Sequence, residues 1–146
     1  MFVKQISVYL ENVRGALREL TALLAEKNVN LLALSIADTA GFGIVRIIVA
    51  SPDLDPAMDA LRGAGYIAKI NNVICLRTPH CPGGLSGVLA LMEKAGINLE
   101  YTYSFVHGST DGAVLILRPS DKDACAALFE QNGVKMVSQQ QVDQLF

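Results

Sequence analysis

The stretch HCPGGLSGVLALMEKAGIN, residues 80–98, places a Pro-Gly-Gly turn directly before an amphipathic helix. A second stretch, NVRGALRELTALLAEKNVN at residues 12–30, has the same design: a loop that ends in Gly, a Leu two residues later, a helical pattern and a hydrophobic-Asn step. The helical stripe is clearest in the later stretch, where the apolar residues of one face are Leu85, Val88, Leu89, Met92 and Ala95. The chain is therefore expected to build the same turn and helix twice.

This similarity extends along the chain as an internal repeat. A shift of 68 positions places Gly83 on Gly15, and the same shift places Asn98 on Asn30. Two copies at a fixed shift indicate a duplicated module. We therefore expect two domains, residues 1–70 and residues 71–146.

Each copy alternates between the periodicities of strands and helices. Apolar residues at every second position predict strands, and apolar stripes at helical spacing predict the helices between them. The expected strands are residues 6–10, 29–37, 43–50 and 66–70 in the first copy, and residues 74–76, 97–106, 112–118 and 134–138 in the second. This βαββαβ order predicts an α+β fold of two ferredoxin-like units, with antiparallel sheets and helices on one face.

Local signals also predict where the second helix of each copy begins. In the first copy, Asp55 is the expected N-cap with Pro56 as the first helical residue. In the second copy, Ser120 is the expected N-cap and Asp123 lies three positions later, in a capping-box arrangement.

The unit resembles the ACT domain in its βαββαβ order, its glycine turn before the first helix and the hydrophobic-Asn-hydrophobic step before its second strand. HCPGGLSGVLALMEKAGINLE is similar to that family's signature, whereas the first copy has Arg14 where the family commonly has proline. The resemblance covers nearly the whole chain, and the chain resembles free-standing proteins made of two ACT units. It implies a non-enzymatic sensor of small molecules in amino-acid metabolism, with no cofactor and no catalytic residue.

Composition excludes several other classes. The net charge is -2 with 12 basic and 14 acidic residues, so the chain carries no electrostatic footprint for nucleic acid. The N-terminal residues lack a signal-peptide pattern, and no apolar stretch reaches the length of a membrane span. The three cysteines show no framework spacing, which is typical of a reducing compartment. We expect a cytoplasmic protein that contacts neither membrane nor nucleic acid.

The glycine turn has a physical reason to bind a ligand. A helix N-terminus presents unpaired backbone N–H groups and the positive end of the helix dipole, which suit a carboxylate. Glycine permits positive φ and close approach of a ligand to the backbone. Glu11 and Asn12 offer acceptor oxygens for an ammonium group, whereas the equivalent Pro79 and His80 are poorer acceptors. The first turn is therefore ranked as the better pocket for a free amino acid, which we expect to bind at this turn and at the interface between the two units.

The predicted binding residues are the two turns and the helix starts that follow them. The first turn contributes Glu11, Asn12, Val13, Arg14, Gly15, Ala16 and Leu17, and the second contributes His80, Cys81, Pro82, Gly83, Gly84 and Leu85. The alternative interpretation is that these glycines only make a tight connection between strand and helix.

Other interpretations carry less weight. Cys81, near a helix N-terminus, could make the protein a thiol-dependent enzyme, although the local sequence offers no base for it. A zinc site built from His80, Cys81, Cys75 and His107 does not match a structural zinc spacing. A third alternative is a purely structural oligomerisation module.

Two features concern the surfaces of the predicted sheets. Both alternating faces of residues 30–37 are largely apolar, which predicts that the protein is at least a homodimer. The resemblance to the ACT domain further implies that the protein acts in trans on a metabolic enzyme or regulator. Arg46 lies within a strand of Ile and Val, which indicates a polar sheet face in preference to a ligand clamp.

Overall fold

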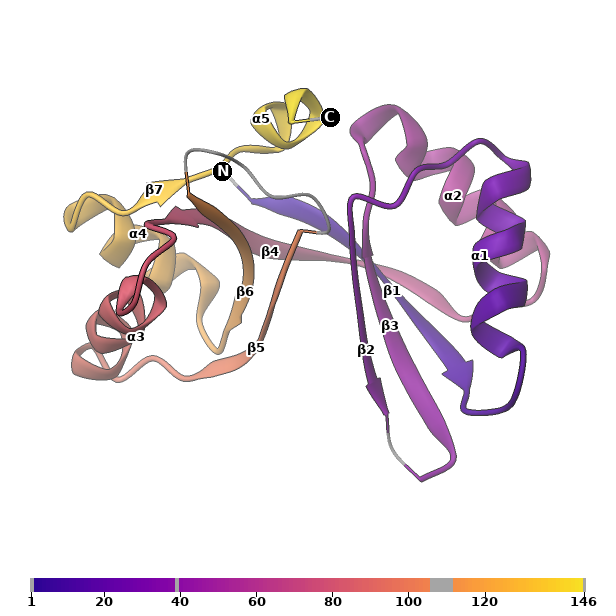
Figure 1. The fold of residues 1–146 in the computed structure, drawn as a ribbon, viewed down its shortest axis with the longest axis horizontal. Coiled ribbons are helices and arrows are strands. Elements are labelled where there is room, and N and C mark those ends of the chain that lie inside the picture. Colours follow the sequence, from indigo (N-terminus) through magenta and orange to yellow (C-terminus); the bar gives the residue numbers. More distant parts are fainter. Residues whose placement is uncertain (1, 39, 106–111, 146) are drawn as a thin grey trace. The chain divides into compact units, whose positions relative to one another are not determined.

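The computed structural model describes residues 2–38, 40–105 and 112–145. The chain forms two compact units. The N-terminal unit consists of Lys4–Asn71, and the C-terminal unit consists of Asn72–Leu145 together with Phe2 and Val3. The junction between Asn71 and Asn72 lies inside one uninterrupted strand, β4 (Ala68–Thr78), which contributes residues to both units (Figure 1).

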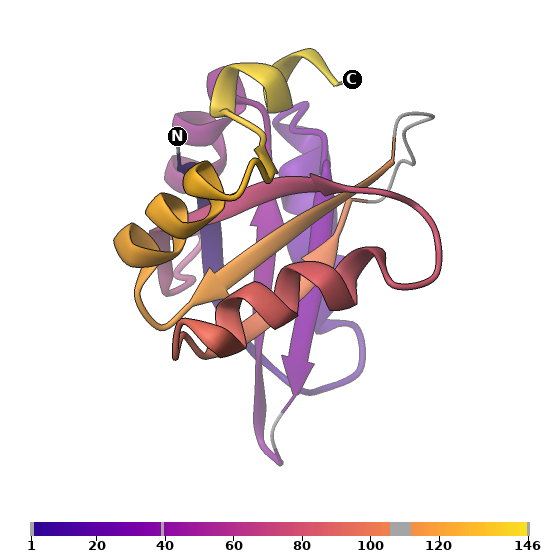
Figure 2. The same ribbon diagram turned by 90° about the vertical axis from the view of Figure 1, so that its left-hand side faces the viewer.

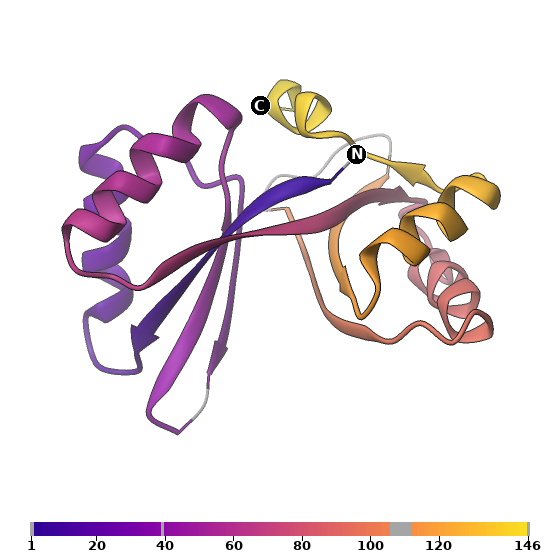
Figure 3. The same ribbon diagram turned by 180° about the vertical axis from the view of Figure 1, so that it is seen from behind.

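The N-terminal unit has the βαββαβ order. Its elements are β1 (Val3–Glu11), α1 (Ala16–Glu26), β2 (Ala33–Asp38), β3 (Phe42–Ile48), α2 (Ser51–Gly63) and the first part of β4. The strands lie in the order β2-β3-β1-β4, and β3 pairs antiparallel with both β1 and β2. Helices α1 and α2 cover one face of this sheet, as the view from behind shows (Figure 3).

Alternation along β1 decides which face carries the core of this unit. Ile6, Val8 and Leu10 are buried and belong to one hydrophobic cluster, to which α1 contributes Leu20 and Leu24. Residues at even positions of the strand therefore face the helices, because successive side chains of a strand point to opposite faces.

The C-terminal unit repeats the same order. Its elements are the remainder of β4, α3 (Gly84–Lys94), β5 (Leu99–Ser104), β6 (Ala113–Pro119), α4 (Lys122–Gln131), β7 (Lys135–Met136) and α5 (Gln139–Gln144). The strands lie in the order β7-β4-β6-β5, and β4 pairs antiparallel with β6 and β7. Helices α3 and α4 cover one face (Figure 2), where Ile74, Leu76, Met92 and Phe129 are buried in one cluster.

These observations confirm the predicted fold class of two ferredoxin-like units. Two features were not predicted. The closing strand of the first unit and the opening strand of the second are a single strand, β4. The short helix α5 follows β7 and begins with a capping box between Ser138 and Gln141.

Both predicted helix starts are wrong in detail. Helix α2 begins at Ser51 after Ala50, so Asp55 and Pro56 lie inside the helix. Proline is tolerated in the first turn, as at Pro52, because the first N–H groups of a helix have no intrahelical partner. Pro56 lies beyond that turn and leaves the carbonyl four residues earlier without its helical donor.

In α4 the N-cap is Asp121, whose side chain accepts a hydrogen bond from the Ala124 N–H at 3.0 Å. The predicted cap, Ser120, instead accepts a hydrogen bond from the backbone N–H of Asn98 at 3.2 Å. The capping box expected between Ser120 and Asp123 is therefore also wrong. Within the described residues, no helix is both long and apolar enough to cross a membrane.

Candidate functional site

The turn between β1 and α1 has a backbone that only glycine adopts without strain. Gly15 is the N-cap of α1, with φ +84°, and no side chain caps this helix. The Ala16 N–H donates to the Val13 carbonyl at 3.2 Å, and the Glu19 N–H donates to the Gly15 carbonyl at 3.0 Å. The amides of Leu17 and Arg18 lie between these two and have no earlier helical carbonyl to reach.

The turn between β4 and α3 repeats this geometry. Gly83 is an N-cap with φ +86° and no side-chain cap. The Gly84 N–H donates to the Cys81 carbonyl at 3.1 Å, and the Gly87 N–H donates to the Gly83 carbonyl at 3.0 Å. Each of these bonds lies 68 positions after its counterpart in the first turn. The repeat thus preserves the backbone of the turn. The expected positive φ is confirmed at Gly15 and Gly83, whereas Gly84 does not have it.

A cavity of about 260 Å³ lies beside the first turn, within the N-terminal unit. The end of β1, the turn, the start of α1 and the segment between α2 and β4 surround it. Its lining residues are Tyr9, Leu10, Glu11, Val13, Arg14, Ala16, Glu19 and Tyr66. A free amino acid of modest size fits a space of this volume.

The charges of this cavity, called the N-terminal cavity below, suit a zwitterion. Glu11 and Glu19 supply two carboxylates and Arg14 supplies one guanidinium, and the described residues form no ion pair with any of the three. Glu19 lies in the first turn of α1, where the helix dipole favours a negative side chain. Tyr9 and Tyr66 add aromatic surface with hydroxyl groups.

The structure brings part of the predicted first site to this cavity. Glu11, Val13, Arg14 and Ala16 line it, whereas Asn12, Gly15 and Leu17 do not. The backbone N–H of Asn12 donates to the Gly41 carbonyl at 3.4 Å.

Four lining residues lie outside the prediction: Tyr9, Leu10, Glu19 and Tyr66. Glu19 could have been found, because it lies three positions after Ala16 and therefore on the same side of α1. Tyr66 carries no such signal, since it reaches the cavity only through the pairing of β1 with β4, in which the Tyr9 N–H donates to the Ile67 carbonyl at 3.0 Å.

The second predicted site does not line the cavity described in its unit. A cavity of about 450 Å³ lies within the C-terminal unit and is called the C-terminal cavity below. It is lined by Arg77, Thr78, Pro79, Val88, Gly133, Val134 and Lys135. None of the six predicted residues from His80 to Leu85 lines it, and His80, Cys81, Pro82 and Gly83 are exposed.

Gly84 has a packing role that the sequence did not reveal. A Cβ atom at this position would collide with the carbonyl oxygen of Pro79, whereas Gly15, Gly83 and Gly87 have open space at the equivalent point. This glycine is therefore required for the close approach of α3 to the turn before it.

Two of the three cysteines are buried, and the described residues contain no metal-binding cluster. Burial raises the pKa of Cys75 to about 12, although the nearby Arg77 opposes the shift. Burial, with a smaller contribution from Asp121, raises the pKa of Cys125 to about 11. Both thiols are therefore protonated at neutral pH. Cys81 is exposed, and the structure describes no group of three or more metal-ligating side chains. His107, considered above as a zinc ligand, lies outside the described residues.

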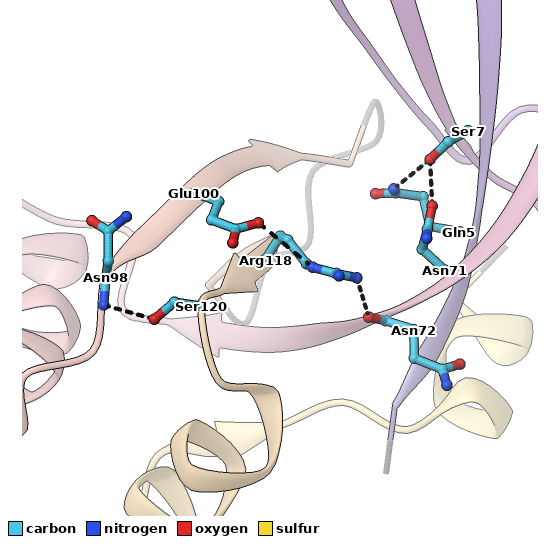
Figure 4. A network of polar contacts seen from close by, with 8 residues as sticks. All are labelled: Gln5, Ser7, Asn71, Asn72, Asn98, Glu100, Arg118 and Ser120. Carbon is cyan, nitrogen blue, oxygen red and sulfur yellow. Dashed lines mark hydrogen bonds and ion pairs between the residues drawn. The ribbon is translucent and has the colours of Figure 1, made fainter.

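Arg46 lies in a polar row of the N-terminal sheet. It pairs in register with Ser7 on β1 and with Ser35 on β2. The Ser7 hydroxyl donates to Asn71 Oδ1 at 2.8 Å and accepts from Gln5 Nε2 at 3.0 Å, as Figure 4 shows. Gln5 is fully buried on the sheet face that does not carry the helices, and the Ser7 hydroxyl gives its side chain a hydrogen-bond partner.

The C-terminal sheet has its own polar contacts (Figure 4). Arg118 on β6 lies 3.8 Å from Glu100 on β5 and donates to the carbonyl of Asn72 at 3.2 Å. These contacts join neighbouring strands, and none of the three residues lines a described cavity.

Comparisons with known proteins agree with this architecture. The family model for an ACT domain pair matches residues 1–146. The chain is similar to protein BT0572 from Bacteroides thetaiotaomicron, with 36% identity, coverage of 99% of this chain and 98% of that chain, and a TM-score of 0.89. No curated protein matches the chain significantly.

More distant structures share the fold alone. The regulatory subunit of aspartate kinase from Thermus thermophilus, in its ligand-free form, is 14% identical over 88% of this chain and 91% of that chain, with a TM-score of 0.63. The corresponding subunit from Thermus flavus is 13% identical over 88% and 90%, with a TM-score of 0.59.

Proposed function

The chain belongs to the family of ACT domain pairs, and on that premise we propose that it is a non-enzymatic regulatory protein that binds a free amino acid in the N-terminal cavity. The observation that carries this proposal is the lining of that cavity: two carboxylates and one guanidinium beside an uncapped helix N-terminus. An α-amino acid carries the complementary groups, an ammonium and a carboxylate.

The proposed pose assigns each end of the ligand to a group on this chain. The ammonium lies against Glu11 and Glu19, because carboxylates stabilise a bound cation through charge-assisted hydrogen bonds. The ligand carboxylate lies at the start of α1, where the first amides and Arg14 favour an anion. Ala16, one of the predicted binding residues, does not offer its N–H to the ligand in this pose, because that N–H already donates to the Val13 carbonyl.

Regulation follows if the ligand prefers one conformation or assembly state of the protein. A ligand shifts such an equilibrium only by its difference in affinity for the two states. Distant ACT folds named as regulatory subunits of an enzyme support this part of the proposal. We propose that this chain likewise acts in trans on a metabolic enzyme or regulator.

The first experiment is a thermal-shift screen of the twenty amino acids on the full chain. A ligand at about 100 times its Kd adds about 2.7 kcal/mol to the apparent stability, so a true ligand raises Tm clearly. Calorimetry then gives the affinity for each amino acid that raises Tm. A purely structural oligomerisation module would show no shift with any amino acid.

A matched pair of variants locates the site. Glu11→Gln removes one carboxylate of the N-terminal cavity and is expected to weaken amino-acid binding by about 1.5–3 kcal/mol. Glu26→Gln changes an exposed glutamate at the C-terminal end of α1, outside the cavity, and should leave the affinity unchanged. Equal affinities for wild type and Glu11→Gln would contradict the proposed pose.

A second pair tests the turn itself. Gly15 and Gly83 have nearly the same φ and open space, so Asn, which tolerates this conformation, adds a side chain with similar strain at either position. We expect Gly15→Asn to weaken binding and Gly83→Asn to leave it unchanged. Valine would be a poorer probe than asparagine, because a β-branched residue at φ +84° strains the backbone whether or not a ligand is present.

A further inference from the structure

The C-terminal cavity occupies the same place in its unit as the N-terminal cavity does in the other. Two backbone hydrogen bonds fix this correspondence. The Tyr66 N–H donates to the Leu61 carbonyl at 3.0 Å, and 68 positions later the Val134 N–H donates to the Phe129 carbonyl at 3.0 Å. Tyr66 lines the first cavity and Val134 lines the second. The walls of the two cavities can therefore be compared residue by residue.

Three positions in the layer between sheet and helices carry smaller side chains in the second unit. The aligned pairs are Tyr66 with Val134, Leu20 with Val88 and Leu10 with Thr78. All three residues of the first unit belong to its hydrophobic cluster or pack against it, and Val88 and Val134 do the same in the second unit. Thr78 is buried and lies two positions after Leu76 on β4, so it is on the same sheet face. The second unit thus lacks apolar volume that the first unit has at the same place.

The cavity volumes agree with these replacements. The C-terminal cavity has about 450 Å³, against about 260 Å³ for the N-terminal cavity. Smaller core side chains leave a cavity where the backbone does not collapse onto it. The backbone here keeps the geometry of the first copy, since Gly65 and Gly133 both have positive φ. Pro79 and Gly133 border the cavity and are exposed, so a molecule from solvent can reach it.

The walls of this space suit a neutral, apolar ligand. Val88 and Val134 contribute hydrocarbon surface, and Thr78 contributes one hydroxyl group. Arg77 and Lys135 also border the cavity, but each is adjacent in its strand to a residue of the helix-covered face, so strand alternation directs both side chains to the opposite face. Apolar cavities exclude water and take up small aromatic molecules.

The first unit indicates which molecule has the right shape. There the Tyr66 side chain is partly buried against the hydrophobic cluster, at the position where the second unit has only Val134. We propose that the C-terminal cavity binds a neutral molecule with a single aromatic ring, which takes the place that the Tyr66 ring has in the first unit. This proposal does not depend on amino-acid binding at the N-terminal cavity.

The probe is p-cresol, which is the side chain of tyrosine as a free molecule. It is titrated into the full chain by calorimetry and NMR. We expect saturable binding at a single site with a Kd of about 1 mM or lower, which is ordinary for a ligand of about eight non-hydrogen atoms. Nuclear Overhauser effects should connect the ring protons with the methyl groups of Val88 and Val134. Binding that does not saturate, or Overhauser effects to other methyl groups only, would overturn the proposal.

Matched variants test the place of the ring. Val134→Tyr restores the side chain of the first unit and is expected to lower the p-cresol affinity at least about tenfold, because the cavity is then filled from within. Val88→Leu restores the residue found at Leu20 and should lower the affinity about threefold by narrowing the same space. Ala90→Tyr adds the same ring at an exposed position of α3 outside the cavity and should leave the affinity unchanged.

The variants also define how the proposal fails. It is wrong if Val134→Tyr, folded with at least the wild-type Tm, keeps the wild-type affinity, or if Ala90→Tyr loses as much affinity as Val134→Tyr. If Val134→Tyr does not fold, Val88→Leu decides, and an unchanged affinity in that variant overturns the proposal. Glu11→Gln separates the two sites, because it should weaken amino-acid binding and leave p-cresol binding intact.

Discussion

At the scale of single residues, the glycines of the two turns have different roles. Gly15 and Gly83 are required for their positive φ, which a residue with a Cβ adopts only with strain. Gly84 has an ordinary φ, but its missing Cβ leaves room for the carbonyl of Pro79. Gly87, one turn later in α3, has neither requirement and only weakens the helix.

This difference predicts opposite effects for two alanine substitutions in α3. Gly84→Ala should destabilise the protein by about 2 kcal/mol, because the turn must shift to avoid the collision with Pro79. Gly87→Ala should stabilise it by about 0.5–1 kcal/mol, since alanine is the better helix former and meets no atom. Urea unfolding measures both; two effects of the same sign would contradict the interpretation of Gly84.

The buried thiols give the stability a defined dependence on pH. Cys75 and Cys125 have folded pKa values of about 12 and about 11, against 9.0 when solvated. Between these values the unfolded chain loses thiol protons that the folded chain keeps, so the free energy of unfolding falls as the pH rises above 9. Urea unfolding under reducing conditions at pH 8, 9 and 10 measures this fall. The decrease in the free energy of unfolding should be smaller in Cys125→Ala than in the wild type. An equal decrease in both proteins would contradict the role given to the Cys125 thiol.

At the scale of elements, helix starts depend on contacts that short motifs do not specify. Asp121 caps α4, whereas Ser120 accepts a hydrogen bond from the backbone N–H of Asn98 at the start of β5. The hydroxyl of Ser120 is a competent cap in isolation, and the tertiary contact assigns it elsewhere.

The corrected cap makes a prediction for α4. Asp121→Ala should lower the free energy of unfolding by about 1 kcal/mol, the usual contribution of an N-cap carboxylate. Asp123→Ala is the control, because this exposed side chain interacts mainly with the helix dipole and its loss should cost only a few tenths of a kcal/mol. If chemical denaturation ranks the two variants in reverse order, the cap is wrongly assigned.

At the scale of the whole molecule, apolar surface is unevenly distributed. All the large hydrophobic side chains that are exposed among the described residues lie in the N-terminal unit: Tyr9, Val13, Ile36, Phe42, Ile67 and Ile70. Tyr9 and Phe42 also contact each other, with ring centroids 5.6 Å apart. A contiguous apolar patch is typical of an interaction site, and the contact between Tyr9 and Phe42 makes these two exposed side chains contiguous.

We therefore keep the prediction that the protein is at least a homodimer. Analytical ultracentrifugation at micromolar concentration should give a species of at least twice the chain mass. Ile67→Glu, at a side chain that is 62% exposed, should shift the equilibrium toward monomer, because it places a charge in the apolar surface. Lys69→Glu, at an exposed position two residues later on β4, is the control. A monomeric wild type would contradict the prediction.

The sequence alone determined those features that depend on residues close together in the chain. The repeat, the order of strands and helices and the glycine turns with positive φ all follow from local periodicity and from the conformational freedom of glycine. Glu11, Val13, Arg14 and Ala16 were assigned to the candidate site for the same reason, since they surround one turn.

Only the tertiary structure decided the features that join distant segments. Tyr66 reaches the first cavity, and Lys135 reaches Arg77, through strand pairing across more than one element. Pairing partners are selected by burial of whole sheet faces, a property that no short stretch carries. For that reason the sets of residues that line the two cavities became visible only when the sheets were assembled.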